Sequence, residues 1–276
     1  MEDDLSVAGE TCAGAWLAAS RAVIAAGGEA YNVKIQVLDP LRETAGDAAV
    51  IGAVDSFLRA GGANPVSTVV NTIFPSVWAR GKSAEELFRD YPPMAVRMRR
   101  ITNDWGRYFG RMIAWQESGE PAKQRSGKPV NQLGDMIAVM KTQVAAGTVF
   151  GNMFEVAIYN PLLDRKLWRN RQCLSFLSFK VEQAGDGYRL GLTAVYRNHH
   201  YITRCLGNFI GLGRLMRFVA AEAGIGRVGT LTCVSTHAEI DTKSNAWGKA
   251  DALGLVERCE QLVAAGDTTG GVPAAA

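Results

Sequence analysis

Four residues that could carry out chemistry fall on consecutive predicted elements in the second half of the chain. Cys173 opens an alternating apolar run that predicts a strand over residues 173–181, and Arg197 follows a second predicted strand over 188–196. Asn208 heads an apolar segment of helical period, and His237 lies at the end of a third predicted strand. A thiol, a guanidinium, an amide and an imidazole together predict a site for an anionic, hydrogen-bonding substrate.

The elements that must position these residues form an α+β pattern. Helices are predicted in the N-terminal half at residues 11–26, 45–60, 83–90, 94–117 and 130–145, with one strand at 32–38. Strands dominate residues 148–241, where 183–187 connect a hairpin and 207–223 form a helix; a last helix covers 251–265. We therefore expect one domain over residues 11–266, with disordered tails at 1–10 and 267–276.

Composition excludes several functional classes. The net charge is +3 with scattered basic residues, which does not predict nucleic-acid binding. The longest apolar run, residues 14–27, contains Arg21 and is too short to span a membrane. Five cysteines without a CxxC pair indicate reduced thiols and a cytoplasmic protein. His199 and His200 would point to opposite faces of a strand, so we expect no metal site.

The residues around the four candidates resemble the thymidylate synthase superfamily, which includes the pyrimidine nucleotide hydroxymethylases. The resemblance covers about 90 residues and rests on the segments Tyr159-Asn160, Arg171-Gln172-Cys173, Val195-Tyr196-Arg197-Asn198, Leu206-Gly207-Asn208-Phe209-Ile210 and Ser235-Thr236-His237. It implies a large mixed sheet with helices on one face. It also implies a homodimer in which the sheets of two subunits pack back to back, through apolar strand residues such as Phe176, Leu190 and Leu192.

The resemblance implies a role for each candidate in binding a pyrimidine nucleotide. The Cys173 thiolate would add to C6 of the ring, and Arg197 would help the thiol to ionise while binding the phosphate. Asn208 would hydrogen-bond a uracil-type base, and His237 would contact the sugar hydroxyl. The remaining substrate-binding candidates are Asn198, Glu239 at the place of a sugar-binding tyrosine, and Arg42 as a phosphate ligand.

The chain departs from the family pattern at positions that carry catalysis. Asn71 stands where the resemblance places the catalytic glutamate, and an amide cannot transfer protons. Phe109 stands at the place of a catalytic tyrosine, for which the adjacent Tyr108 would substitute. His200 and Arg204 occupy positions that contact the folate, which argues against 5,10-methylenetetrahydrofolate as the cofactor.

Several interpretations remain open from the sequence. The preferred one is a transferase that modifies C5 of a uracil-type nucleotide through the Cys173 adduct, by one-carbon transfer. The alternatives are a folate-independent reaction through the same adduct (decarboxylation, dehalogenation or base release) and a catalytically silent nucleotide-binding protein. Cys173 is also explained as a structural thiol, Arg197 as an ion-pair partner and Asn208 as a helix cap. The glycines of the run 207–213 are expected to let a helix approach the sheet closely.

Overall fold

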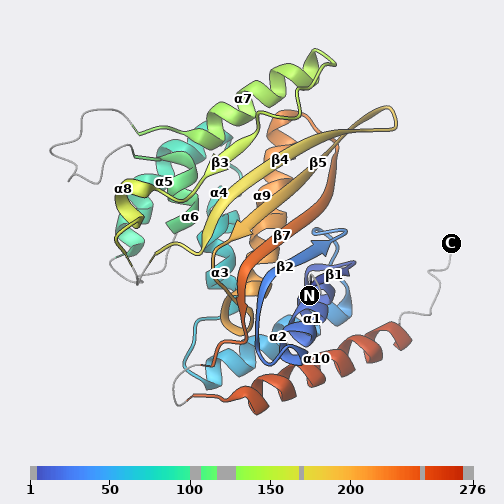
Figure 1. Cartoon of the computed structure of the whole chain (residues 1–276). Helices are drawn as coiled ribbons and strands as arrows, with labels where there is room; N and C mark the ends of the chain where they lie inside the picture. Colours follow the sequence, from blue (N-terminus) through green and yellow to red (C-terminus); the bar gives the residue numbers. More distant parts are fainter. Residues whose placement is uncertain (1–4, 100–106, 117–128, 168–170, 243–245, 270–276) are drawn as a thin grey trace.

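The computed structural model describes residues 5–99, 107–116, 129–167, 171–242 and 246–269 of the 276-residue chain. Within these residues the chain is α+β, with one mixed sheet in the order β1-β2-β7-β5-β4-β3 and β6 paired with β7 (Figure 1). The strands are β1 (Ser6–Gly9), β2 (Glu29–Val37), β3 (Glu155–Ala157), β4 (Leu174–Ala184), β5 (Gly187–Tyr196), β6 (His199–His200) and β7 (Arg227–Glu239).

The helices are in large part those that the sequence predicts. They are α1 (Cys12–Ala25), α2 (Ala45–Ala60), α3 (Val66–Ile73), α4 (Ser76–Ala79), α5 (Ala84–Arg99), α6 (Arg107–Ile113), α7 (Gln132–Ala145), α8 (Pro161–Asp164), α9 (Leu206–Ala223) and α10 (Lys249–Thr269). Thr11 caps α1 by accepting a hydrogen bond from the Gly14 amide, at 3.1 Å. No helix in the described part of the chain is long and apolar enough to cross a membrane.

The centre of the sheet carries the candidate site. β4 and β5 form the predicted hairpin, in which Ala184 pairs with Gly187 and Gly185 adopts a φ of 64°. β5 runs parallel to β7, and β7 runs antiparallel to β2. The β4–β5 register shifts between Leu174 and Phe176, immediately after Cys173. Such a bulge changes the direction of side chains locally, which sets the orientation of the residues at the start of β4.

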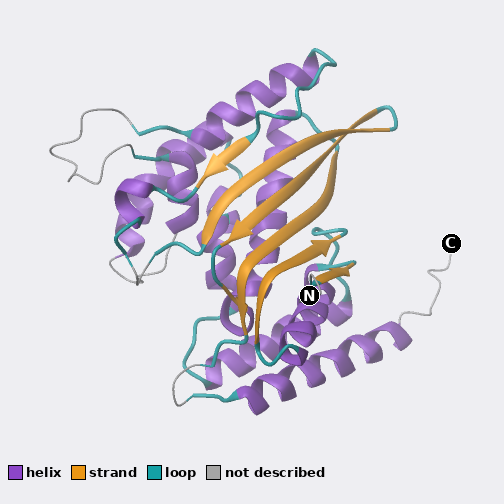
Figure 2. Cartoon of the chain, viewed as in Figure 1, coloured by secondary structure: helices purple, strands orange, loops and turns teal. Residues whose placement is uncertain are grey.

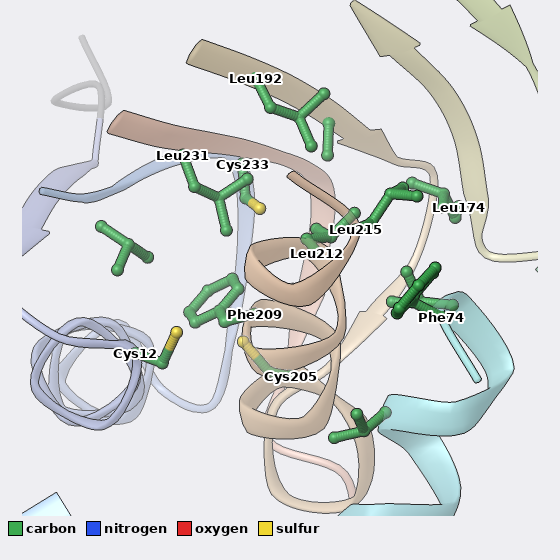
Figure 3. Packing of buried hydrophobic residues seen from close by; sticks show 14 of the residues in the cluster. Cys12, Phe74, Leu174, Leu192, Cys205, Phe209, Leu212, Leu215, Leu231 and Cys233 are labelled. Atoms are coloured by element: carbon green, nitrogen blue, oxygen red, sulfur yellow. The ribbon is translucent and has the colours of Figure 1, made fainter. Parts of the chain in front are cut away.

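One face of the sheet packs against helices. Figure 2 shows α9 behind β5 and β7, and no helix of the described residues over the near face of these strands. On β7 the residues Leu231, Cys233 and Ser235 alternate into the interior and are fully buried. Figure 3 shows Cys233 and Leu231 facing Phe209 of α9, with Cys12 and Cys205 beside the same ring. The core therefore lies between the sheet and the layer of α1 and α9.

The helix-free face differs from the expected apolar surface. Leu190 and Leu192 are buried in the core on the helix side, so they cannot form a sheet-to-sheet contact with a second copy. Phe176 is 37% exposed, and it pairs with Val195 in the β4–β5 ladder. The reason for the difference is alternation along the strands: Leu192 pairs with Phe179 and lies an odd number of residues from Val195, the partner of Phe176, so the two pairs point to opposite faces.

Three further expectations are wrong for physical reasons. Residues 6–9 are not a disordered tail, because they pair in parallel with residues 34–37 of β2. Likewise α10 continues to Thr269, beyond the expected start of the C-terminal tail. The predicted helix over 94–117 begins inside α5 and, among the described residues, ends at Ile113 of α6; residues 100–106 and 117 lie outside the described residues. α5 continues through Pro92 and Pro93 because Leu87, Tyr91 and Ala95 form a buried stripe at four-residue spacing.

The glycines of α9 bring it close to another helix rather than to the sheet. A Cβ on Gly207 would lie 2.7 Å from the Val69 Cβ, and one on Gly211 would lie 3.0 Å from the Ile73 Cβ. Val69 and Ile73 both belong to α3. Gly207 and Gly211 are four residues apart and so lie on the same face of α9, and because they have no side chains, this face packs closely against α3. This contact fixes α3 beside the start of α9, where Asn208 lies.

Candidate functional site

A cavity of about 200 Å³ lies where β4 begins and β5 ends. Cys173 precedes β4 and Asn198 follows β5, while α6 contributes Tyr108 and α9 contributes Asn208. The remaining lining residues are Val69, Thr72, Arg171, Gln172, His199, His200 and Arg204. Four of the predicted site residues therefore meet at one cavity, although they come from separate elements.

The Cys173 thiol is half-buried and lies in a mixed electrostatic environment. Burial raises its pKa, whereas the guanidinium groups of Arg197 and Arg204 and a hydrogen bond with Tyr108 act to lower it. The burial effect is the largest, so the resting thiol is protonated at neutral pH. The Tyr108 oxygen is itself held by the backbone amides of Leu174 and Cys173, and burial raises the Tyr108 pKa. The Cys173 thiol is thus oriented by Tyr108 but not ionised.

Arg197 lies beside the cavity rather than on its wall. Its Nε donates to the Gln172 carbonyl at 2.8 Å, and its Nη2 donates to the Arg171 carbonyl at 2.9 Å. These bonds hold the segment before Cys173 against the end of β5, together with the bond from the Arg197 amide to the Cys173 carbonyl at 2.9 Å. Arg197 therefore positions the cysteine and adds positive potential near it.

Arg171 and Arg204 are the guanidinium groups that line the cavity, and neither was selected from the sequence as a phosphate ligand. The Arg171 guanidinium stacks over the Tyr159 ring at 4.8 Å. Its Nε is buried and has no hydrogen-bond partner within the described residues. A buried N–H donor without a partner is costly, so this atom favours an anionic oxygen on a ligand.

Two other predicted substrate ligands, Asn198 and His237, are hydrogen-bonded to each other. The Asn198 Oδ1 lies 2.5 Å from His237 Nδ1, and the Asn198 Nδ2 lies 2.9 Å from His200 Nε2. His237 Nε2 lies 2.7 Å from Glu29 Oε1, and its ring stacks on Tyr31 at 5.3 Å. His237 is therefore engaged at the rim and does not line the cavity, contrary to the expected role.

Three further candidates also lie off the cavity wall. Glu239 lines a neighbouring cavity of about 430 Å³, where its Oε2 lies 3.5 Å from His200 Nε2. Arg42 is exposed, pairs with Glu10 at 3.4 Å and is not among the lining residues of the Cys173 cavity. Asn71 is replaced on the wall by Val69 and Thr72, which lie three residues apart on one face of α3. The Thr72 hydroxyl donates to the Val69 carbonyl at 2.6 Å.

Asn208 is buried and is held by His199. Its Nδ2 lies 3.0 Å from His199 Nε2, and His199 Nδ1 lies 2.8 Å from the Ser235 hydroxyl. Burial lowers the His199 pKa to about 3, so the ring is neutral at physiological pH. The His199 ring also stacks flat on Tyr196, with centroids 4.0 Å apart. The sequence does not point to His199 or Thr72 as site residues. Each nevertheless lies next to a candidate, His199 beside Asn198 and Thr72 beside Asn71.

Two larger cavities adjoin the cavity of Cys173. One of about 510 Å³ shares Gln172 with it, and the cavity of about 430 Å³ shares His200 and Arg204. No group of three or more metal-ligating side chains occurs within the described ranges. No protein-family model and no curated protein matches the sequence of this chain. The chemistry of the site therefore rests on its own geometry.

Proposed function

We propose that the chain is an enzyme that adds Cys173 to C6 of a uracil-type pyrimidine nucleotide and changes the substituent at C5. The observation that supports this is the convergence of a thiol, an amide and two guanidinium groups on one cavity beside β4 and β5. A pyrimidine nucleotide has the matching groups: an electrophilic C6, a ring edge with donor and acceptor atoms, and an anionic phosphate.

The proposed covalent step uses the contacts around Cys173. The Sγ forms a bond with C6, and the C5–C6 π electrons move toward O4, which makes C5 nucleophilic. Arg197 and Tyr108 stabilise the thiolate as it forms, because both lower the pKa of Cys173. The Arg171 and Arg204 guanidinium groups would bind the phosphate, since both line the cavity.

The proton that leaves Cys173 needs an acceptor, and His200 is the group we assign. Of the two imidazoles that line the cavity, His199 has a pKa of about 3 and is held on both nitrogens. His200 is half-exposed and lines the same cavity as Cys173, and its Nε2 is the nitrogen that contacts Asn198. It would accept the thiol proton and return a proton to C5, in place of the carboxylate that α3 lacks.

One-carbon transfer is the preferred outcome at C5, with a donor at the oxidation level of formaldehyde. A folate-independent reaction through the same adduct is the second candidate. The His200 and Arg204 side chains favour this second candidate. They separate the Cys173 cavity from the neighbouring cavity of about 430 Å³, and they are charged or polar where a flat pterin would need an apolar surface. The residues that line these two cavities do not match the apolar surface that a folate would need.

Exchange of the C5 hydrogen of uridine and deoxyuridine monophosphate with deuterated water tests the adduct without a second substrate. We expect exchange with the wild-type chain and none with Cys173→Ala. Cys259→Ala is the matched control, because Cys259 is a buried thiol on α10 that lies outside the cavity. Equal exchange by wild type and Cys173→Ala, or no exchange with either nucleotide, would refute the proposal.

Adding 5,10-methylenetetrahydrofolate then separates the two outcomes. A nucleotide product heavier by one carbon unit would support one-carbon transfer. Turnover of 5-carboxylated or 5-halogenated nucleotides that is unaffected by the folate would support the second candidate. Binding of nucleotides without any exchange would identify a catalytically silent protein.

We also propose that the helix-free face of the sheet pairs with a second copy of the chain. Thr193 and Val195 on β5 pair with Thr232 and Val234 on β7, and all four are half-buried on this face. Sedimentation of the wild type and of Phe176→Glu tests this, because a charge on the exposed Phe176 would weaken such a dimer. A monomeric wild type would exclude it.

A further inference from the structure

The π-helical turn Tyr201–Cys205 connects β6 to α9 and carries Arg204. Arg204 lines both the Cys173 cavity and the neighbouring cavity of about 430 Å³. Its guanidinium group is also one of the two positive charges that lower the pKa of Cys173. Turns of this kind are rare inside helices and occur frequently at functional sites. The contacts that hold the turn in place therefore bear on the charge near Cys173.

Asp241 lies two residues after the end of β7 and holds the turn with both oxygens of its carboxylate. Its Oδ1 accepts from the Ile202 amide at 2.8 Å and from the Thr203 amide at 3.3 Å. Its Oδ2 accepts from the Thr203 hydroxyl at 2.5 Å. The first amides of a helix have no acceptor within the helix, so the carboxylate supplies what the turn itself lacks. The helix dipole also favours a negative charge at this end.

Asp241 is itself held from the side opposite the turn. It is buried, and its carbonyl accepts from the Trp247 Nε1 at 2.9 Å. The Trp247 ring packs against Phe57 of α2, with ring centroids 5.2 Å apart. These contacts connect α2 through Trp247 to Asp241 and the turn. The carboxylate therefore offers the turn an acceptor whose position does not depend on the turn.

We infer that Asp241 is a positioning residue that keeps Arg204 directed into the Cys173 cavity by holding the π-helical turn. Without the carboxylate, the Ile202 and Thr203 amides lose their acceptor, and the turn is free to move together with Arg204. The consequence for catalysis rests on the proposed function, in which Arg204 binds the phosphate. The positioning is a property of the chain alone and is tested without a nucleotide, so the two proposals can fail separately.

The sign of the change at Cys173 separates positioning from a direct effect of charge. Arg197, Arg204 and Tyr108 lower the pKa of this thiol, against the larger effect of burial. The other ionisable groups that line the larger cavity with Arg204 are His200, Glu239 and Asp241. Removal of a carboxylate by itself leaves more positive potential and lowers the pKa of Cys173. Displacement of Arg204 removes positive potential and raises it.

Alkylation of Cys173 by iodoacetamide between pH 7 and 10 measures this sign. In Asp241→Ala we expect the pH profile to move to higher pH and the rate at pH 8 to fall about fivefold, the effect of weakening one nearby charge interaction. Asp241→Asn keeps an oxygen that accepts from the two amides, so its profile should not move to higher pH. Asp47→Ala is the matched control, because Asp47 is a buried carboxylate that accepts from the Thr44 amide and hydroxyl and lines neither cavity.

Arg204→Met shows whether the effect passes through Arg204. In this background Asp241→Ala should leave the profile unchanged, because the charge that the turn positions is already absent. A shift of Asp241→Ala to lower pH, no shift, or the same upward shift in both backgrounds would overturn the inference.

Thr203→Val provides a second variant if Asp241→Ala is too unstable to measure. It removes the hydroxyl bond to the carboxylate with little change of shape, so it should move the profile in the same direction. An unchanged profile in Thr203→Val would also overturn the inference. Failure of the proposed function has a different signature, because the wild type would then show no exchange at C5.

Discussion

Replacing Tyr108 by phenylalanine is the most direct test of the electrostatics at Cys173. Burial raises the pKa of this thiol, and the hydrogen bond with the Tyr108 hydroxyl is one of three interactions that lower it. Phenylalanine keeps the ring and removes only that hydroxyl. The pKa of Cys173 should therefore rise further in the variant, and the thiolate should become scarcer at any given pH.

The size of the effect on the Cys173 pKa follows from the hydrogen bond between the Tyr108 hydroxyl and the thiol; the variant also loses the bonds that this oxygen accepts from the Leu174 and Cys173 amides. A hydrogen bond of about 1 kcal/mol net corresponds to about 0.7 of a pKa unit. Below the pKa, a shift of that size reduces the thiolate fraction about fivefold. Because the thiolate is the reactive form, the rate of alkylation of Cys173 at pH 8 should also fall about fivefold.

Alkylation by iodoacetamide, followed by intact mass between pH 7 and 10, measures this rate. Cys173→Ala gives the background from the other thiols, which are buried. Tyr188→Phe is the matched control, since Tyr188 is a half-buried tyrosine at the far end of β5 and outside the cavity. A Tyr108→Phe variant that reacts as fast as the wild type at pH 8 would refute the proposed stabilisation of the thiolate.

Three further predictions concern packing, pH and a buried charge. Gly207→Ala should lower the free energy of unfolding in urea by about 1–3 kcal/mol, because the added methyl group would clash with α3. Gly52→Ala in α2 is the control: the added methyl group has open space, so the variant should be neutral or stabilising. Burial raises the pKa of Cys233, so its thiol stays neutral in the folded chain and ionises in the unfolded one. The contribution of this thiol to the free energy of unfolding is therefore fully present below about pH 8.5 and falls by about 1.4 kcal/mol per pH unit above it. The Cys233→Val variant should lose this part of the pH dependence. Arg111→Met should cost about 3 kcal/mol in the same assay, because the Asp164 carboxylate, 1% exposed, loses its guanidinium partner; a change under 1 kcal/mol would contradict this.

Local signals in the sequence were sufficient for the elements that flank the site. The cap at Thr11 and the glycines after α1 define that helix, and the turn at 185–186 defines the β4–β5 hairpin. These features depend only on residues that are neighbours in the sequence, so they can be predicted without knowledge of the tertiary structure. Strand β1 is different, because four residues form a strand only through their pairing with β2.

The candidate site was predictable in its centre and not at its rim. Cys173 and Asn208 meet because each lies at the end of an element whose limits the sequence indicates, and Tyr108 joins them from α6, which lies inside the longer predicted helix over 94–117. The wall residue of α3 is Thr72 rather than Asn71, since one residue along a helix rotates a side chain by about 100°. The bonds of Arg197 to backbone carbonyls depend on the path of the segment before β4, which no local pattern encodes.

The partition between the Cys173 cavity and its larger neighbour consists of the His200 and Arg204 side chains, which line both. Arg204 lies on the π-helical turn Tyr201–Cys205, which Asp241 anchors by accepting from the Ile202 amide at 2.8 Å. The backbone of this partition is therefore held in place, and the His200 and Arg204 side chains set how far it separates the two cavities. Smaller residues at these positions would join the two cavities into one larger cavity, while the sheet and Cys173 stay in place.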